Sequence, residues 1–428
     1  MGSFSEIGFR VKPPKQTLLF LLGLFSTIQI LQVAGFAVST YLAVLTAGYL
    51  LLTQGFDFRR DWHLLVILFF TGVTFTVSML SDLPAGYKAA SLTGTIQWGM
   101  IFVICAYMRK EKSDGALRAF ARGFDWSCRL QLVWCILQMG AWYGLETDLN
   151  AKVFGELLGV SHETSQYRQG VLACTGLHWH AANLIPVLVY TYFRYKNLFI
   201  KLLCLALTYL TKNATSLVAL VSAVVLELVL FAKRTLCDRG CAVSYRIAVY
   251  ILLALGGLLA VSPIFLPKVA QTIEYLLLRV YQIWDPSLGG ESSAVHFSYY
   301  KNLPYILQNI PLREVLFGSG IGTSGYRFSF FYQQYTDQIW SVESDFVDAV
   351  LSRGVVGMLL QYSLLLRIAW RMARKNRVWV SCVMLVLLVC GFIYDNQFLW
   401  VQLLGYLFYC STYQESFTKE SKLWVRSK

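Results

Sequence analysis

The run from Ser341 to Gly357 places three carboxylates and one arginine at the head of a largely apolar stretch. Ionisable side chains are costly in a segment of membrane length, so they usually face a cavity and act on a ligand. Glu343 and Asp345 can serve as a general base, or they can cap the helix in interfacial water. Arg353 lies about ten residues, or about 15 Å of helical rise, further along, where capping cannot explain it and a guanidinium could bind an anion.

Two histidines and two more cations are the other candidates for chemistry. His178 and His180 flank Trp179, and residues at i and i+2 do not share a helical face, so no metal site is expected there. Either histidine could act as a base, or could bond to the adjoining loop without a catalytic role. Arg168 and Lys212 add positive charge near the same expected surface. No cofactor is predicted, because we find no Gly-rich phosphate loop in the sequence.

The elements that position these residues are expected to be membrane helices. Of 428 residues, 56% are hydrophobic and 14% are charged, and the mean hydropathy is +0.53, whereas a soluble domain is about 25% charged. Long apolar runs recur from end to end, which excludes a soluble globular protein and also a β-barrel, whose strands alternate. The net charge of +13 fits basic loops on one side of a membrane, so no nucleic-acid partner is expected.

Apolar stretches bounded by charges, turns and aromatic residues predict an all-α polytopic membrane protein with about twelve transmembrane helices. Lys and Arg gather in the loops that this count places inside, which predicts that both termini are cytoplasmic. The first apolar run is expected to be an uncleaved helix, because no small-residue cleavage site follows it. The expected helices cover 17–34, 36–53, 63–81, 91–108, 126–146, 182–195, 197–211, 215–232, 246–265, 343–367, 378–394 and 396–412.

Two loops on the outer side, about 149–181 and about 266–342, are long enough to fold. Their Trp, Tyr, Phe and apolar runs argue against disorder and predict folded caps over an outer cavity. The aromatic rings could stack on sugar rings or pack within the loops. A single integral membrane domain is therefore expected over 1–428, with the larger loop between the ninth and tenth helices.

Glu343 is followed by an aromatic residue three positions on, Phe346, and by glycines eleven and fourteen positions on, Gly354 and Gly357. This pattern, placed after a large outer loop, resembles that of the O-antigen polymerase and O-antigen ligase superfamily. Ligases of that superfamily usually carry His at the first position. Glu343 therefore favours a resemblance to the polymerases of lipid-linked repeat units.

Three further segments contribute to the comparison with this superfamily. Leu316 to Thr323 looks like its glycine-rich segment, and Arg168 to Gly170 with His178 to Asn183 resemble its Arg-, Gly- and Asn-rich entry into the middle helices. The chain departs from the pattern where many members have a Ser-Arg pair, because Lys212 stands in that segment. It also has Lys301, rather than an Arg, where ligases tend to carry one in the large loop.

The resemblance implies an inverting, metal-independent, polyprenyl-diphosphate-dependent glycosyltransferase on the periplasmic face of the bacterial cytoplasmic (inner) membrane. Its donor and acceptor would be undecaprenyl-diphosphate-linked oligosaccharides, and its partners the lipid bilayer, a chain-length regulator and a flippase. This reaction needs a base for the acceptor hydroxyl and a cationic clamp for the departing diphosphate. The predicted catalytic residues are Glu343, Asp345, His178 and His180, the diphosphate-binding residues are Arg168, Lys212 and Arg353, and further glycan or phosphate contacts are Arg279, Lys301 and Arg327.

Three other functions stay open at this point. An O-antigen ligase that transfers glycan to lipid A core differs from a polymerase, in this sequence, only through Glu343 in place of His. A transporter or flippase of lipid-linked glycan also suits twelve helices, although transporters commonly show repeats or paired broken helices. Binding or signalling without catalysis is the third alternative.

Overall fold

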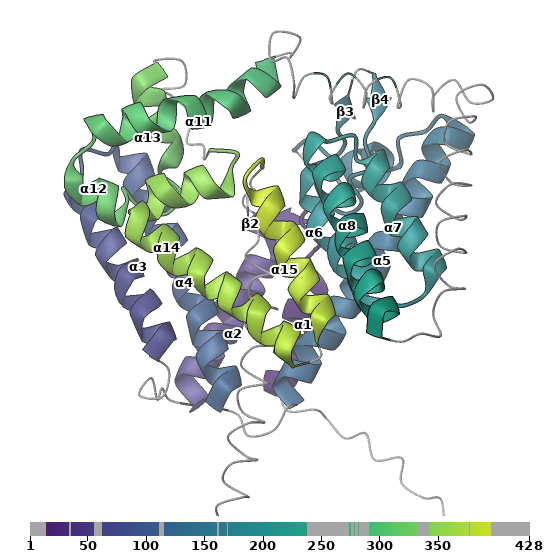
Figure 1. The fold of residues 1–428 in the computed structure, drawn as a ribbon, viewed down its shortest axis with the longest axis horizontal. Coiled ribbons are helices and arrows are strands. Elements are labelled where there is room, and N and C mark those ends of the chain that lie inside the picture. Colours follow the sequence, from purple (N-terminus) through teal and green to yellow (C-terminus); the bar gives the residue numbers. More distant parts are fainter. Residues whose placement is uncertain are drawn as a thin grey trace, which may run out of the picture.

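The computed structural model describes residues 14–33, 36–54, 62–110, 115–160, 162–168, 170–237, 274, 278, 281, 291–332, 342–375 and 377–394. The fold is predominantly helical (Figure 1). Its two short hairpins pair β1 (Gln32–Val33) with β2 (Phe36–Ala37) and β3 (Tyr167–Arg168) with β4 (Val171–Leu172). The longer elements are α1 (Pro14–Phe25), α2 (Val38–Gln54), α3 (Trp62–Leu80), α4 (Ala85–Lys110), α5 (Gly115–Leu145), a π-helix (Ala151–Leu157), α6 (Ala181–Arg194), α7 (Leu198–Leu210), α8 (Ala214–Cys237), α11 (Glu291–Asn309), α12 (Leu312–Phe317), α13 (Ser324–Tyr332), α14 (Asp345–Arg374) and α15 (Val378–Gly391).

Ten of the twelve expected helices fall on described residues, and each corresponds to a helix there. The expected helices 246–265 and 396–412 lie outside the described residues. Among the described residues, two helices are long and apolar enough to cross a membrane, Ala85–Tyr107 and Asp345–Arg374, and the other apolar helices there are shorter. The helical class is therefore confirmed, and the count of twelve crossings remains a proposal.

Several helix boundaries differ from the sequence prediction. Helix α8 ends at Cys237 rather than near 232, and α14 ends at Arg374 rather than near 367. The first helix ends at Phe25 rather than near 34, because the backbone N–H groups of Gln29 and Ile30 bond to the carbonyl of Leu177, both at 3.0 Å. The fourth begins at Ala85 instead of 91 and the fifth at Gly115 instead of 126. A hydropathy boundary marks where apolar residues end, whereas a helix continues for as long as its polar residues can face water.

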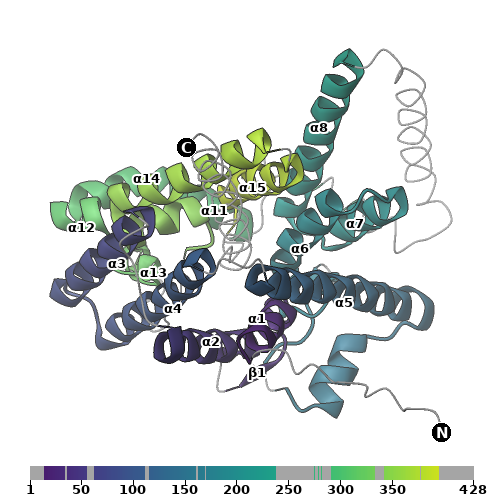
Figure 2. The same ribbon diagram turned by 90° about the horizontal axis from the view of Figure 1, so that it is seen from below.

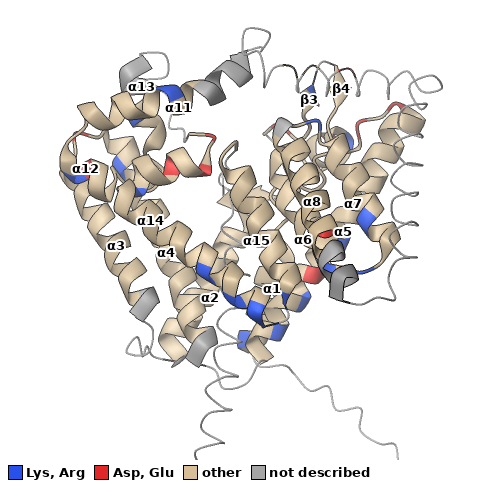
Figure 3. Ribbon diagram, viewed as in Figure 1, with Lys and Arg blue, Asp and Glu red and all other residues tan. Residues whose placement is uncertain are grey.

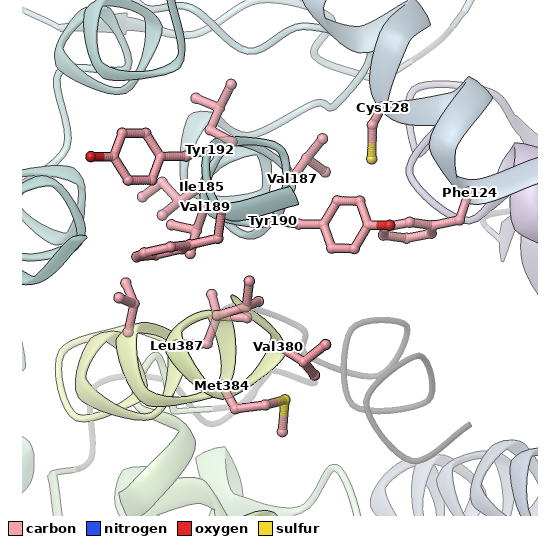
Figure 4. Packing of buried hydrophobic residues seen from close by; sticks show 14 of the residues in the cluster. Phe124, Cys128, Ile185, Val187, Val189, Tyr190, Tyr192, Val380, Met384 and Leu387 are labelled. Atoms are coloured by element: carbon pink, nitrogen blue, oxygen red, sulfur yellow. The ribbon is translucent and has the colours of Figure 1, made fainter. Parts of the chain in front are cut away.

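Helix α6 forms the centre of the main core. Every residue from Ala181 to Phe193 is buried, so this helix is enclosed on all sides rather than amphipathic. Figure 4 shows its side chains between α15 and α5, with the Tyr190 ring pointing at Phe124. These two rings meet edge to face at 4.8 Å, and the Tyr190 hydroxyl donates to Asp125 at 2.8 Å. The arrangement gives a large buried ring a partner for its polar atom.

Helices α1 and α5 cross closely through two glycines, as seen side by side in Figure 2. A Cβ atom at Gly23 would lie 2.3 Å from the Phe120 carbonyl oxygen, and one at Gly123 would lie 2.1 Å from that of Phe20. Small residues at a helix crossing let the two backbones approach, which is typical of membrane helix pairs.

The second core lies among α11, α13 and the first half of α14. Tyr299, Ile306, Phe328, Val347 and Leu351 are buried there and pack against one another. Residues 291–332 of the large loop therefore form three helices, α11, α12 and α13, of which α11 and α13 pack on α14 in this core.

Helix α14 is broken at Gly354, whose dihedrals are φ 70° and ψ 173°. The break frees the carbonyls of Leu351 and Ser352, which accept the N–H groups of Ser319 and Gly320 at 2.9 and 3.0 Å. The glycine-rich segment and the Gly-x-x-Gly pair noted in the sequence therefore meet backbone to backbone. Gly354 has the positive φ that glycine adopts without strain.

Replacing Gly354 by Ala should destabilise the fold by about 3–5 kcal/mol. The new Cβ would lie 2.3 Å from the Leu316 carbonyl carbon and oxygen, and these backbone atoms cannot rotate away. Thermal unfolding of purified protein in detergent measures the effect. Gly48→Ala is the matched control, because a Cβ at that helical position meets nothing within 4 Å. Equal loss of thermal stability in the two variants would contradict the proposed close approach.

Candidate functional site

The C-terminal end of α15 contacts the head of α14 through Ser344. This serine caps α14, accepting the N–H of Val347 at 3.4 Å, as Ser commonly does at a helix N-terminus. Its Oγ also lies 3.4 and 3.3 Å from the carbonyl oxygens of Gly391 and Phe392. The Tyr300 hydroxyl lies 2.9 Å from the same Oγ and bonds to the Phe392 carbonyl. One serine thus joins α11, α14 and α15.

An aromatic stack fixes the same junction. Phe346, in the first turn of α14, stacks on Tyr300 with ring centroids 6.3 Å apart and on Phe392 at 5.1 Å. Offset stacking of this kind stabilises a pair by about 0.5–1.5 kcal/mol. Phe346 is the aromatic residue of the sequence pattern, and in the structure it holds the carboxylate-bearing head of α14 against α15.

The three carboxylates of the pattern lie in different surroundings. Glu343 is exposed and directly precedes the capping serine, and Asp345 is half-buried in the first turn, where its charge acts on Tyr300. Asp348 instead accepts hydrogen bonds from Ser324 at 2.5 Å and Ser352 at 2.9 Å. Figure 3 shows the acidic residues at this end of α14. Glu343 therefore lies open to solvent at the head of α14, whereas Asp348 links α13 to α14.

His180 approaches the other side of the α15 end. It caps α6, and its Nδ1 accepts the N–H of Ala182 at 3.3 Å. Its ring stacks on Tyr394 with centroids 5.4 Å apart, and the Tyr394 hydroxyl lies 3.0 Å from Nδ1. Burial, and then the positive charge of Arg168, lower the pKa of His180 to about 4. The imidazole is therefore neutral at pH 7 and suited to hydrogen bonding.

His178 is more deeply placed than His180. It is 2% exposed, and burial lowers its pKa to about 3. Within the described part of the chain, neither of its ring nitrogens has a hydrogen-bond partner. His178 is therefore a buried, neutral imidazole two residues before His180.

Arg168 lies on β3 in a hairpin that is fastened from two sides. The neighbouring Tyr167 hydroxyl donates to Asp148 at 2.5 Å, and the N–H of Cys174 donates to the Leu210 carbonyl at 2.9 Å. Arg168 itself is half-buried, and its charge reaches His180. A guanidinium carried on a hairpin that is fixed in this way can present its planar fork to an anion.

Lys212 lies beneath this hairpin, away from the exposed position expected of a diphosphate contact. It is 1% exposed and has a φ of 52°, and its Nζ donates to the Leu172 carbonyl at 2.9 Å. Burial lowers its pKa to about 7. This geometry gives Lys212 a positioning role, holding the Arg168 hairpin to the turn between α7 and α8.

The titration of Lys212 should make the free energy of unfolding rise with pH between about 7 and 10. Its folded pKa of about 7 lies below the usual lysine value near 10.5, so in this window the unfolded state binds more protons and loses relative stability as pH rises. Lys212→Met removes the titrating group and should flatten this dependence. Thermal unfolding of both proteins at pH 7 and pH 9 measures it. An equal pH dependence of thermal stability in the wild type and in Lys212→Met would contradict the role of Lys212 in this effect.

Arg353 lies on the wall of an apolar pocket between α3, α4 and α14. Its guanidinium carbon is 4.3 Å from the Trp98 ring centroid, and its Nη1 donates to Gln361. Apolar side chains form most of the wall, with Thr71 and Thr74 among the polar exceptions. The cation–π contact and the amide hold the guanidinium in a fixed orientation inside an apolar site.

The remaining predicted contacts divide among three situations. Arg327 forms a buried ion pair with Glu314 at 2.6 Å, which ties α13 to α12. Lys301 is exposed on α11. Arg279 lies outside the described residues.

Three residues at the α15 junction were missed by sequence reasoning: Ser344, Tyr300 and Tyr394. Ser344 had a detectable signal, because serine before an acidic first turn is an N-cap pattern. Tyr300 and Tyr394 carry no local sequence signal, because their roles come from contacts with residues that lie 44 and 214 positions away in the sequence.

The site therefore consists of two groups of residues. Glu343 and Asp345 lie at the head of α14, and Arg168 and His180 lie on β3 and at the start of α6. Each group is connected to residues at or just after the end of α15. This arrangement provides a carboxylate that can accept a proton and a guanidinium that can bind an anion. No group of three or more potential metal ligands occurs in the part of the chain that the structure describes. No family model matches this sequence, and no curated protein is significantly similar to it.

Proposed function

We propose that this protein is an integral membrane glycosyltransferase that polymerises undecaprenyl-diphosphate-linked oligosaccharide repeat units on the periplasmic face of the bacterial cytoplasmic membrane. One observation carries the proposal. The end of α15 contacts the carboxylate-bearing head of α14 through Ser344. Just after α15, Tyr394 contacts His180, which lies close enough to Arg168 for the arginine's charge to act on it. The base and the anion-binding group that this reaction needs thus belong to one connected junction.

The reaction follows from the roles of these groups. A hydroxyl of the incoming lipid-linked unit attacks the anomeric carbon of the growing chain, and the bond from that carbon to the diphosphate oxygen breaks. Glu343 accepts the hydroxyl proton, with Asp345 the next candidate. Arg168 stabilises the negative charge on the departing undecaprenyl diphosphate. Arg353 offers a second guanidinium, within apolar walls that suit an isoprenoid chain.

The proposed topology places about twelve crossings in the membrane, both termini inside, and the two loops 149–181 and 266–342 outside. Single cysteines at the exposed positions Leu158 and Tyr305 should react with an impermeant reagent in intact cells. A cysteine at the exposed position Arg118 should react only after permeabilisation. Labelling at Tyr305 only after permeabilisation would place the carboxylates on the wrong side for the reaction.

The function is tested by incubating the purified protein with a lipid-linked repeat unit and separating the products on a gel. A ladder of chain lengths is expected from the repeat unit alone. Transfer that occurs only when a lipid A core acceptor is added would identify a ligase instead. If the substrate stays unchanged in detergent but crosses the bilayer of vesicles that contain the protein, the protein is a transporter.

A further inference from the structure

A pocket separate from the candidate site lies between α1 and the N-terminal part of α5. Gln16 and Thr17 line it from α1, and Arg118, Arg122 and Trp126 line it from α5. Both arginines are exposed, as is Trp126 at 52%. Lys and Arg gather at the lower end of the molecule in Figure 3, opposite the end that holds β3 and β4.

The polar part of the pocket continues into an apolar stripe on the same helix face. Arg118, Arg122 and Trp126 follow one another at intervals of four residues, which places them on one side of α5. Leu130, Val133 and Leu137 extend that side, and their exposed fractions are 42%, 55% and 51%. The opposite side of α5 packs against α1 and α6, so this stripe faces outward.

The residues that line the pocket include two arginines and no carboxylate. The nearest acidic residue on α5, Asp125, forms an ion pair with Arg194 at 3.5 Å and accepts the Tyr190 hydroxyl, so its charge is compensated. Arg129 adds another cation, with its guanidinium carbon 5.2 Å from the Trp126 ring centroid. An anionic ligand is therefore favoured over a neutral one.

The pocket and the apolar stripe together match the chemistry and the length of a phospholipid. Guanidinium groups bind phosphate oxygens through their planar fork, and the Gln16 amide and Thr17 hydroxyl can donate further bonds to the same group. Trp prefers the level of the lipid headgroups. From Trp126 to Leu137 the helix rises about 16 Å, close to the share of one leaflet in a hydrocarbon core of about 30 Å.

We propose that this pocket binds one anionic phospholipid of the inner leaflet, with its phosphate at Arg118 and Arg122 and its acyl chains along the apolar stripe of α5. Basic pockets between membrane helices on the cytoplasmic side bind anionic lipid headgroups in this way. The bound lipid bridges α1 and α5. The proposal depends on membrane insertion and is independent of the reaction proposed above.

Native mass spectrometry of the full-length protein in detergent tests the proposal, with dioleoyl phosphatidylglycerol and dioleoyl phosphatidylcholine as probes. The double variant Arg118→Gln, Arg122→Gln should bind phosphatidylglycerol about 30-fold more weakly than the wild type, with little change for phosphatidylcholine. The control variant Arg367→Gln, Arg374→Gln removes the same charge from α14 and should keep wild-type affinity. Equal weakening in both double variants, or equal affinity of the wild type for the two lipids, would overturn the proposal.

A second measurement does not depend on the arginine variants. The fluorescence of Trp126, taken as the difference between wild type and Trp126→Phe, should be quenched by phosphatidylglycerol with brominated chains at lower mole fractions than by brominated phosphatidylcholine. Identical quenching curves for the two lipids would overturn the specific site.

Discussion

Glu343→Gln should reduce turnover by about 10²-fold or more while leaving membrane insertion and thermal stability unchanged. The amide keeps the shape of the side chain and removes its basicity. Stability should hold because Glu343 is exposed and the helix is capped by Ser344 instead. The measurement is the initial rate of chain growth per folded molecule, followed with a purified lipid-linked repeat unit.

Asp348→Asn is the matched control for this prediction. Asp348 accepts bonds from Ser324 and Ser352, so its loss should lower thermal stability and leave the activity per folded molecule near the wild-type value. Near-normal chain growth by Glu343→Gln would transfer the base role to Asp345, which Asp345→Asn then tests. With a pKa of about 4, His180 is a weaker base than an ordinary histidine.

Arg168→Lys and Arg353→Lys should each reduce activity by about 10- to 100-fold, and the Ala variants should reduce it further. A lysine keeps the positive charge but loses one of the two parallel hydrogen bonds that a guanidinium makes to a diphosphate. Bonds to charged groups are worth about 1.5–3 kcal/mol each, which sets this range. Activity per folded molecule and affinity for the lipid-linked donor are the two readouts.

Arg327→Lys is the control that distinguishes an arginine that binds diphosphate from an arginine with a structural role. Arg327 is buried in its ion pair with Glu314. A lysine there keeps the charge but loses the planar fork that fits the carboxylate, so the substitution should lower thermal stability in step with total activity. The same pattern in Arg168→Lys or Arg353→Lys would assign that residue a structural role. Full specific activity in both Lys variants would contradict bidentate binding.

The sequence predicts the helical class and most helices because apolar runs alone determine them. Val38–Gln54, Trp62–Leu80 and Ala181–Arg194 begin and end within about two residues of the expected bounds. The N-terminal extension of α5 could not be predicted in this way, because the helix there is basic rather than apolar. Its polar turns are positioned by packing of Phe120 and Phe124 on α1.

The candidate site was predicted only in part. Glu343 and Asp345 stand out because carboxylates are unusual before an apolar helix, and the structure places them at the α15 junction. Lys212 was expected to bind diphosphate at or below the outer surface. A backbone turn and a carbonyl 40 residues away instead hold its ammonium inside the fold. The break at Gly354 likewise depends on a contact with Leu316 that no local pattern records.

The most direct test of the central claim counts the undecaprenyl diphosphate released as the polymer grows. The protein, reconstituted in vesicles, receives a repeat unit whose lipid and glycan carry different labels. One undecaprenyl diphosphate should be released for each repeat unit added, and both signals should be lost together in Glu343→Gln. Release without chain growth, or movement of intact lipid-linked glycan across the bilayer without release, would contradict it.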